Sequence, residues 1–282
     1  MNKEILYDLT SLESALESLE LFTKVSKKEI KHFLFNHKED DYLYEKFYEK
    51  YKIDSINLKL DNLYLKVIHV ITNDDECKSI KKFGLLNLQD SIRKDTMLSR
   101  YLKEKGVEID FDKESIVDQN TIYYKSDIMN QKGYYSFFSK EKNLGTSSRR
   151  LFDDYQIEGF LYNTNPLSYG GRVNERAEIL ESLQYIFNNM DIRSEWVDRC
   201  KCYTILFKAS VYNFRWSTFI INDEIESDYT EDSENFIRNG LVEKTLNHIR
   251  TLLIDKTCRE INTLMKLNYN VPPEDIIEYI EN

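Results

Sequence analysis

Hydrophobic residues recur at helical spacing through residues 1–55. They repeat at steps of three and four, which places them on one face of a helix. Twice a serine or threonine stands three positions before a glutamate, and this capping-box spacing marks a helix start. Three short helices are therefore expected. The residues that carry the pattern are Thr10, Glu13, Leu12, Leu16 and Leu19 for the first helix, Ser26, Glu29, Ile30 and Phe33 for the second, and Tyr44, Phe47, Tyr48 and Tyr51 for the third.

The pattern changes to alternation after residue 58. Within residues 63–71 every second residue, His69 included, lies on one face of a strand. Most of the intervening positions are apolar as well, so this strand is expected to be covered on both faces. Asn73 then has the side chain of a helix cap, and Gly84 supplies the stop of a short helix. A strand, helix and turn are therefore expected in succession.

The remaining patterns are shorter and mix strands with helices. A glycine pair, Gly170-Gly171, indicates a turn between two of them, and the acidic run at residues 223–234 is typical of a solvated loop. The expected strands cover 121–124, 134–138, 159–162 and 203–211, and the expected helices cover 95–105, 176–189, 237–252 and 274–280.

This order of elements indicates an α+β protein. We divide the 282 residues into an N-terminal helical region (1–57), a core (58–222) and a C-terminal helical region (223–282). The low counts of Gly 8 and Pro 3 argue against flexible linkers. A hydrophobic fraction of 41% is enough to build a core.

Charge and composition argue against several classes of function. A formal net charge of −10 disfavours broad nucleic-acid binding, because phosphate contacts need clustered Lys and Arg. No apolar run reaches the roughly 18 residues of a membrane span, and no export signal is expected, which makes the cytoplasm the default compartment. The four cysteines do not have the spacing of a zinc site, so no metal is expected. Cys200 and Cys202 are expected to be buried thiols that point the same way from one strand.

The motif His69-Val70-Ile71-Thr72, followed by Ile80 and Phe83-Gly84-Leu85-Leu86, resembles the first motif of the ADP-ribosyltransferases. It is most similar to the branch that holds the DarT toxins and the RNA 2′-phosphotransferases, although the His-to-Thr spacing is one residue longer here. The resemblance implies a split β-sheet core and NAD as the substrate. It also implies that His69 hydrogen-bonds the adenosine ribose and that Thr72 helps to orient the dinucleotide. No glycine-rich Rossmann turn follows any strand, so hydride transfer is not expected.

The same family needs an aromatic ring to stack on nicotinamide and a glutamate near the reacting ribose. Tyr134 and Tyr135 are the candidates for the ring, and they point to opposite faces of the expected strand, so only one can stack. Glu178, followed by an aliphatic pair, resembles the late glutamate motif and is the expected catalytic acid. Glu158 is the alternative, because it ends a Gln-x-Glu sequence similar to that of arginine-modifying relatives. Arg172 is expected to bind the pyrophosphate.

The resemblance implies transfer of ADP-ribose from NAD to a macromolecular acceptor, either protein or nucleic acid. Such bacterial enzymes are often toxins or anti-phage effectors, which implies an antitoxin partner. One alternative is a non-catalytic interaction protein that uses the aromatic helix at residues 42–51 as its interface. Another is an RNA 2′-phosphotransferase, which needs paired basic residues, and Arg149 and Arg150 are the best pair.

Overall fold

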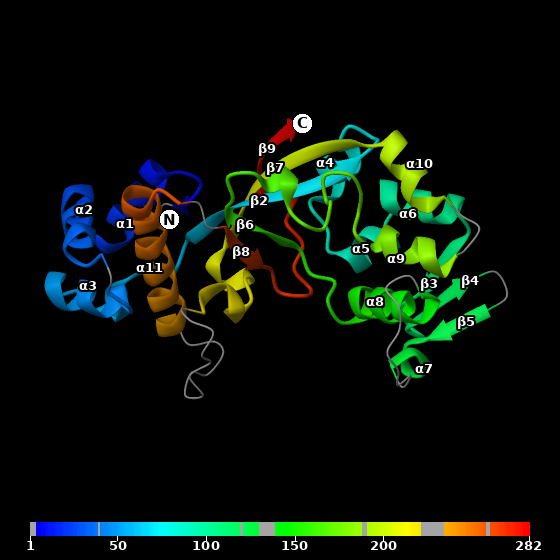
Figure 1. The fold of residues 1–282 in the computed structure, drawn as a ribbon, viewed down its shortest axis with the longest axis horizontal. Helices are drawn as coiled ribbons and strands as arrows, with labels where there is room; N and C mark the ends of the chain where they lie inside the picture. The colour runs from blue at the N-terminus through cyan, green and yellow to red at the C-terminus, as the bar shows by residue number, and fades with distance from the viewer. Residues whose placement is uncertain are drawn as a thin grey trace. The chain divides into compact units, whose positions relative to one another are not determined.

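The computed structural model describes residues 4–38, 40–118, 121–129, 139–187, 191–220, 234–257 and 260–282. The expected α+β class is confirmed, since helices and strands are mixed along the whole chain (Figure 1). Within the described ranges, no helix is both long and apolar enough to cross a membrane.

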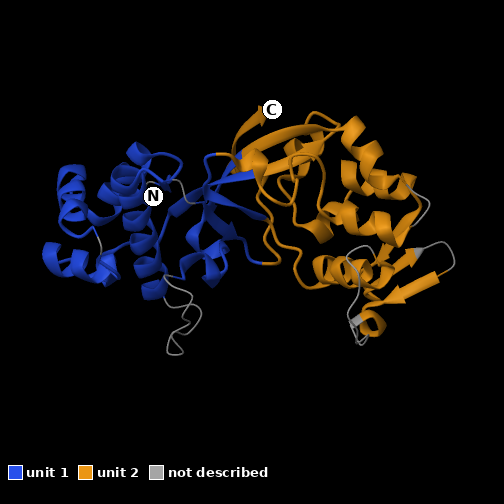
Figure 2. Cartoon of the chain, viewed as in Figure 1, with its two compact units in different colours: residues 1–69, 158–164, 206–266 blue, residues 70–157, 165–205, 267–282 orange. Residues whose placement is uncertain are grey.

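The chain divides into two compact units that are each built from separated segments (Figure 2). Strands β2 (Leu63–Asn73) and β7 (Lys201–Ser210) each begin in one unit and end in the other. The expected boundaries at residues 57 and 222 therefore do not coincide with this division. Unit 1 comprises residues 1–69, 158–164 and 206–266, and unit 2 comprises residues 70–157, 165–205 and 267–282.

In unit 1, helices pack beside part of a β-sheet. In that sheet β6 lies between β2 and β8 and is antiparallel to both, β7 lies on the other side of β2, and β1 pairs in parallel with β2. The elements are β1 (Ile5–Tyr7), α1 (Leu12–Thr23), α2 (Lys27–Asn36), α3 (Leu43–Tyr51), η1 (Ser55–Asn57), β6 (Glu158–Tyr162), η3 (Val211–Asn213), η4 (Trp216–Phe219), α11 (Glu234–Arg250), η5 (Thr251–Asp255) and β8 (Ile261–Leu264).

The three N-terminal helices occur where the sequence predicts them. Ser26 and Glu29 form the expected capping box at the start of α2. The box of α1 is one residue later than expected, because Ser11 caps the helix through Ser14 while Thr10 hydrogen-bonds Asp8.

The aromatic face of α3 is directed into unit 1. Phe47 is fully buried and packs edge-on against Phe33, with 5.1 Å between ring centroids. The backbone N–H of Tyr44 donates to the buried carboxylate of Glu243 on α11 at 2.7 Å. The residues proposed as an interaction surface thus contribute largely to the core of this unit.

Unit 2 contains the second part of β2, the first part of β7 and a separate antiparallel sheet of order β3-β4-β5. Strand β9 lies beside β7. The further elements are α4 (Lys78–Phe83), α5 (Leu88–Arg93), α6 (Met97–Glu104), β3 (Val107–Asp110), β4 (Ser115–Asp118), β5 (Thr121–Tyr124), α7 (Lys125–Met129), α8 (Lys140–Phe152), η2 (Pro166–Ser168), α9 (Ile179–Ile186), α10 (Ile192–Arg199), η6 (Pro273–Asp275) and β9 (Ile276–Glu281).

One hydrophobic cluster of unit 2 holds α8, α9 and α10 together. Leu144 and Leu151 of α8 and Leu180 and Leu183 of α9 belong to it, together with Trp196 of α10. Because both α8 and α9 are anchored in the same core, the backbone at their ends is held in place by close packing.

Three expectations of the sequence are corrected here. The last expected helix, 274–280, is the strand β9. The short helix after Asn73 begins later, at Lys78, because Asn73 Oδ1 accepts hydrogen bonds from two loop N–H groups instead. Cys200 and Cys202 do not share a strand, since Cys200 is the cap that ends α10. The expected strand at 134–138 lies outside the described residues.

Candidate functional site

His69 ends the part of β2 that belongs to unit 1, and its ring is fixed by one hydrogen bond. Its Nδ1 lies 2.7 Å from the carbonyl oxygen of Glu158 in β6. A carbonyl oxygen only accepts, so Nδ1 carries the hydrogen and Nε2 keeps its lone pair. Burial lowers the pKa of His69 and outweighs the opposing effect of this hydrogen bond. The ring is therefore neutral at pH 7 and presents an acceptor nitrogen.

Burial also lowers the pKa of a second histidine of unit 1, His248. Its Nε2 donates a hydrogen bond to the Leu9 carbonyl at 2.9 Å. In both cases the folded pKa lies below the unfolded value of about 6.5. The unfolded chain then binds more protons as pH falls through that value, so the stability that these neutral rings provide is present above pH 6.5 and lost below it.

We therefore expect the free energy of unfolding to fall between pH 7.5 and pH 5. Urea titrations of the wild type, His69→Gln and His248→Gln at several pH values measure this, and each variant should have a shallower dependence than the wild type. If the free energy of unfolding depends on pH equally in all three proteins over this range, neither histidine causes the dependence.

Thr72 lies in unit 2, and its hydroxyl has a partner in the core. Its Oγ1 accepts a hydrogen bond of 2.8 Å from the indole Nε1 of Trp196, and the residue is 4% exposed. No local pattern around Thr72 or Trp196 predicts this contact. The hydroxyl that the family resemblance assigns to NAD thus also satisfies a buried indole donor.

Thr72→Val keeps the shape of the side chain but removes the acceptor. The indole N–H of Trp196 would be left buried and unpaired, at an expected cost of about 1–3 kcal/mol in the free energy of unfolding. Chemical denaturation measures this cost, with Thr72→Ser as the control that retains the hydroxyl. A valine variant as stable as the wild type would rule out the structural role.

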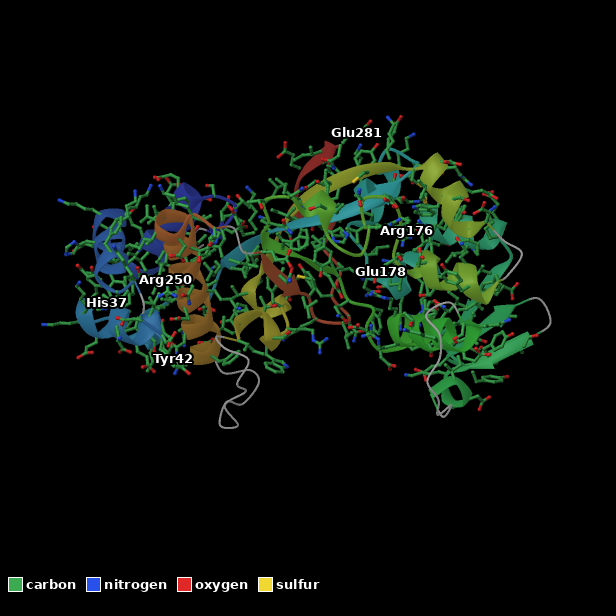
Figure 3. The ribbon with its side chains drawn as sticks, in the orientation of Figure 1. His37, Tyr42, Arg176, Glu178, Arg250 and Glu281 are labelled. Carbon is green, nitrogen blue, oxygen red and sulfur yellow. The ribbon has the colours of Figure 1, made fainter. Side chains whose placement is uncertain are left out.

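Glu178 lies in the segment of unit 2 that leads into α9 (Figure 3). It occupies the N-cap position but makes no side-chain capping bond. Its Oε1 instead accepts a hydrogen bond of 2.5 Å from Nη2 of Arg150 on α8. Its Oε2 borders Gly171, where an added Cβ would lie 3.7 Å away. The carboxylate is therefore paired on one oxygen and bordered by a residue without a side chain at the other.

Arginines and glutamates alternate around this segment. Arg172, with a positive φ of 51° and a largely exposed side chain, has its Nη1 3.7 Å from Glu175 Oε2. Arg176 is 6% exposed and pairs with Glu181 at 2.5 Å. Its Nη1 lies 3.8 Å from Glu175 Oε2, and no described residue forms a hydrogen bond with its Nε or Nη1. Arg193 of α10 approaches the same Glu181 oxygen at 3.5 Å.

The other expected site residues are distributed over the chain. Tyr134 and Tyr135 lie outside the described residues. Glu158 is the first residue of β6 in unit 1, and its side chain is exposed. His69 also belongs to unit 1, whereas Glu178 belongs to unit 2. Among the residues described, no three His, Cys, Asp or Glu side chains form a group that could hold a metal ion.

No protein-family model, curated protein or solved structure matches this chain. The function is therefore inferred from the chemistry of these side chains and from the motif at His69.

Proposed function

We propose that this protein is an ADP-ribosyltransferase, which transfers ADP-ribose from NAD to a macromolecular acceptor, either protein or nucleic acid. The proposal includes the split β-sheet fold of that superfamily. The observation that supports it most is the carboxylate of Glu178, which Arg150 holds beside the Gly170-Gly171 turn. A fixed carboxylate with one oxygen beside a glycine suits a reaction in which positive charge develops on a sugar.

In the proposed reaction, the bond between ribose C1′ and the nicotinamide nitrogen breaks, and its electron pair leaves with nicotinamide. A nucleophilic atom of the acceptor forms the new bond to C1′ and loses its proton. The ribose acquires oxocarbenium character between these events. The carboxylate of Glu178 would accept a hydrogen bond from the 2′-hydroxyl and stabilise that positive charge electrostatically.

His69 would bind the adenosine ribose in this proposal. Its neutral ring and its Nε2 lone pair suit a hydrogen bond donated by a ribose hydroxyl. Thr72 would help to orient the dinucleotide, Arg172 would bind the pyrophosphate, and Tyr134 or Tyr135 would stack on nicotinamide. NAD is then a substrate, and no metal takes part. A toxin or anti-phage role, controlled by an antitoxin, follows from the same resemblance.

The two alternative functions have less support. An RNA 2′-phosphotransferase needs paired basic residues for the transferred phosphate, but Arg149 pairs with Asp154 at 2.6 Å and Arg150 pairs with Glu178. A binding module that uses the helix at 42–51 would present aromatic rings, yet Phe47 is buried.

Nicotinamide release from NAD by the purified protein tests the proposal, with NAD binding measured in parallel by calorimetry. We expect release from the wild type and a strong loss in a folded His69→Ala variant. A wild-type protein that neither binds NAD nor releases nicotinamide would overturn the proposal in favour of a binding module.

A further inference from the structure

We infer that Arg150 positions the Glu178 carboxylate and that Gly171 keeps the second carboxylate oxygen accessible to the reacting ribose. The inference rests on the proposed function, since it gives two further residues a part in the same reaction. Neither is assigned a role by the family motif.

The Glu178 side chain is directed toward Arg150 and away from the start of α9. Glu178 has helical backbone angles, φ −61° and ψ −31°, at the N-cap position of α9. A carboxylate at a helix start is commonly stabilised by the free N–H groups and the helix dipole. Here the side chain makes no such bond and extends to Arg150 on α8. The ion pair with Arg150 therefore sets the direction of this side chain.

The Arg150 side chain is supported by packed helices. Arg150 stands in the last turn of α8, and its side chain is mostly covered, with a relative exposure of 21%. The two helices that carry the pair share the core cluster that contains Leu151 and Leu180. A side chain supported from packed elements is held in place more precisely than one on a loop. Arg150 is thus suited to a positioning role.

The two carboxylate oxygens of Glu178 have different surroundings. Oε1 is engaged by Arg150, whereas an added Cβ at Gly171 would lie 3.7 Å from both Cδ and Oε2 of Glu178. Gly171 does not have a positive φ, so the backbone does not require glycine there. The absence of a side chain leaves space beside Oε2. We assign the hydrogen bond from the ribose 2′-hydroxyl to this oxygen.

Arg150→Gln and Arg150→Lys test the positioning role. Misplacing the carboxylate should lower kcat for nicotinamide release by roughly 10- to 100-fold in Arg150→Gln, while KM for NAD changes little. Arg150→Lys should recover part of this loss. The matched control is Arg149→Gln, because Arg149 is the next residue of α8 and pairs with Asp154 instead, and this variant should retain wild-type kcat.

Gly171→Ala and Gly171→Val test the access to Oε2. The alanine methyl meets its neighbours at 3.6–3.7 Å, which is ordinary contact, so the fold should be retained. We expect kcat to fall in Gly171→Ala and to fall further in Gly171→Val, since the larger side chain covers more of the approach. Gly170→Ala is the control, because an added Cβ at Gly170 has no neighbour within 4 Å.

The outcomes separate the inference from the proposed function. An active wild type, together with folded Arg150→Gln and Gly171→Val variants of unchanged kcat, would overturn the inference and leave the transferase in place. A wild type without NAD binding or nicotinamide release would overturn both. If Arg150→Gln fails to fold, the Gly171 series still decides, because those variants leave the ion pair intact.

Discussion

Glu178→Gln is expected to lower nicotinamide release from NAD by about 10²- to 10³-fold, the usual loss when one group that stabilises transition-state charge is removed. Glutamine keeps the shape of the side chain and still offers an oxygen to Arg150, so the contact with α8 can persist. It lacks the negative charge that would stabilise the oxocarbenium-like ribose. Binding of NAD should therefore change much less than kcat.

Steady-state release of nicotinamide, with circular dichroism of each variant, measures this effect. Glu158→Gln is the informative comparison, because Glu158 is the other candidate acid. Its carbonyl oxygen, rather than its carboxylate, holds His69, so the substitution leaves that contact in place. If Glu158→Gln abolishes release while Glu178→Gln does not, the catalytic acid is Glu158 and the roles of Arg150 and Gly171 are lost with it.

Gly84→Ala is expected to cost about 2–4 kcal/mol in the free energy of unfolding. Gly84 has a φ of +81°, which alanine adopts only at a cost of about 1 kcal/mol. An added Cβ would also lie 1.9 Å from the carbonyl oxygen of Val271, so the backbone must move, at a cost of about 1–3 kcal/mol. That carbonyl accepts a hydrogen bond from Leu85 N at 3.0 Å, and the same displacement would weaken it.

Urea denaturation compares this variant with Gly145→Ala, in which the glycine lies inside α8 with open space around it. The control should be as stable as the wild type or up to about 1 kcal/mol more stable, because alanine favours helices. If Gly84→Ala unfolds with the wild-type midpoint, the close approach to Val271 does not exist in solution. A loss of stability in Gly84→Ala would show that the fold alone explains why glycine stands in the Gly84-Leu85-Leu86 turn.

Helices and strands whose apolar residues repeat with a clear period were predictable from the sequence. Those whose formation depends on contacts with residues far away in the chain were not. The strand at 63–71 alternates, and its observed span is Leu63–Asn73. Helix α8 carries only three apolar residues and contains Gly145, so its formation depends on packing against α9 rather than on propensity. The isoleucines of β9 fit the period of a helix as well as that of a strand. Pairing with the neighbouring strand β7 decides in favour of a strand. At its end, Asn282 N donates to Cys202 O at 3.0 Å.

The residues of the candidate site were also predictable only where a local sequence signal exists. Glu178 could be singled out because an acid before an aliphatic pair is a local signal. Its partner Arg150 is 28 positions away, and the hydrogen bond between Thr72 and Trp196 joins residues 124 positions apart. Contacts at such separations leave no trace in the period or composition of a single sequence. The residue types were therefore predictable, but their partners were not.

The division into interleaved units has a consequence for the synthesis of the chain. The polypeptide changes unit at residues 69, 157, 164, 205 and 266. Strand β6 pairs with β8, which spans Ile261–Leu264, so the sheet of unit 1 stays incomplete until the ribosome has translated residue 264. Until then the edge of β6 that pairs with β8 is open, and an unpaired strand edge favours aggregation. A nascent chain of this protein thus needs residues 261–264 to complete the sheet that begins at residue 5.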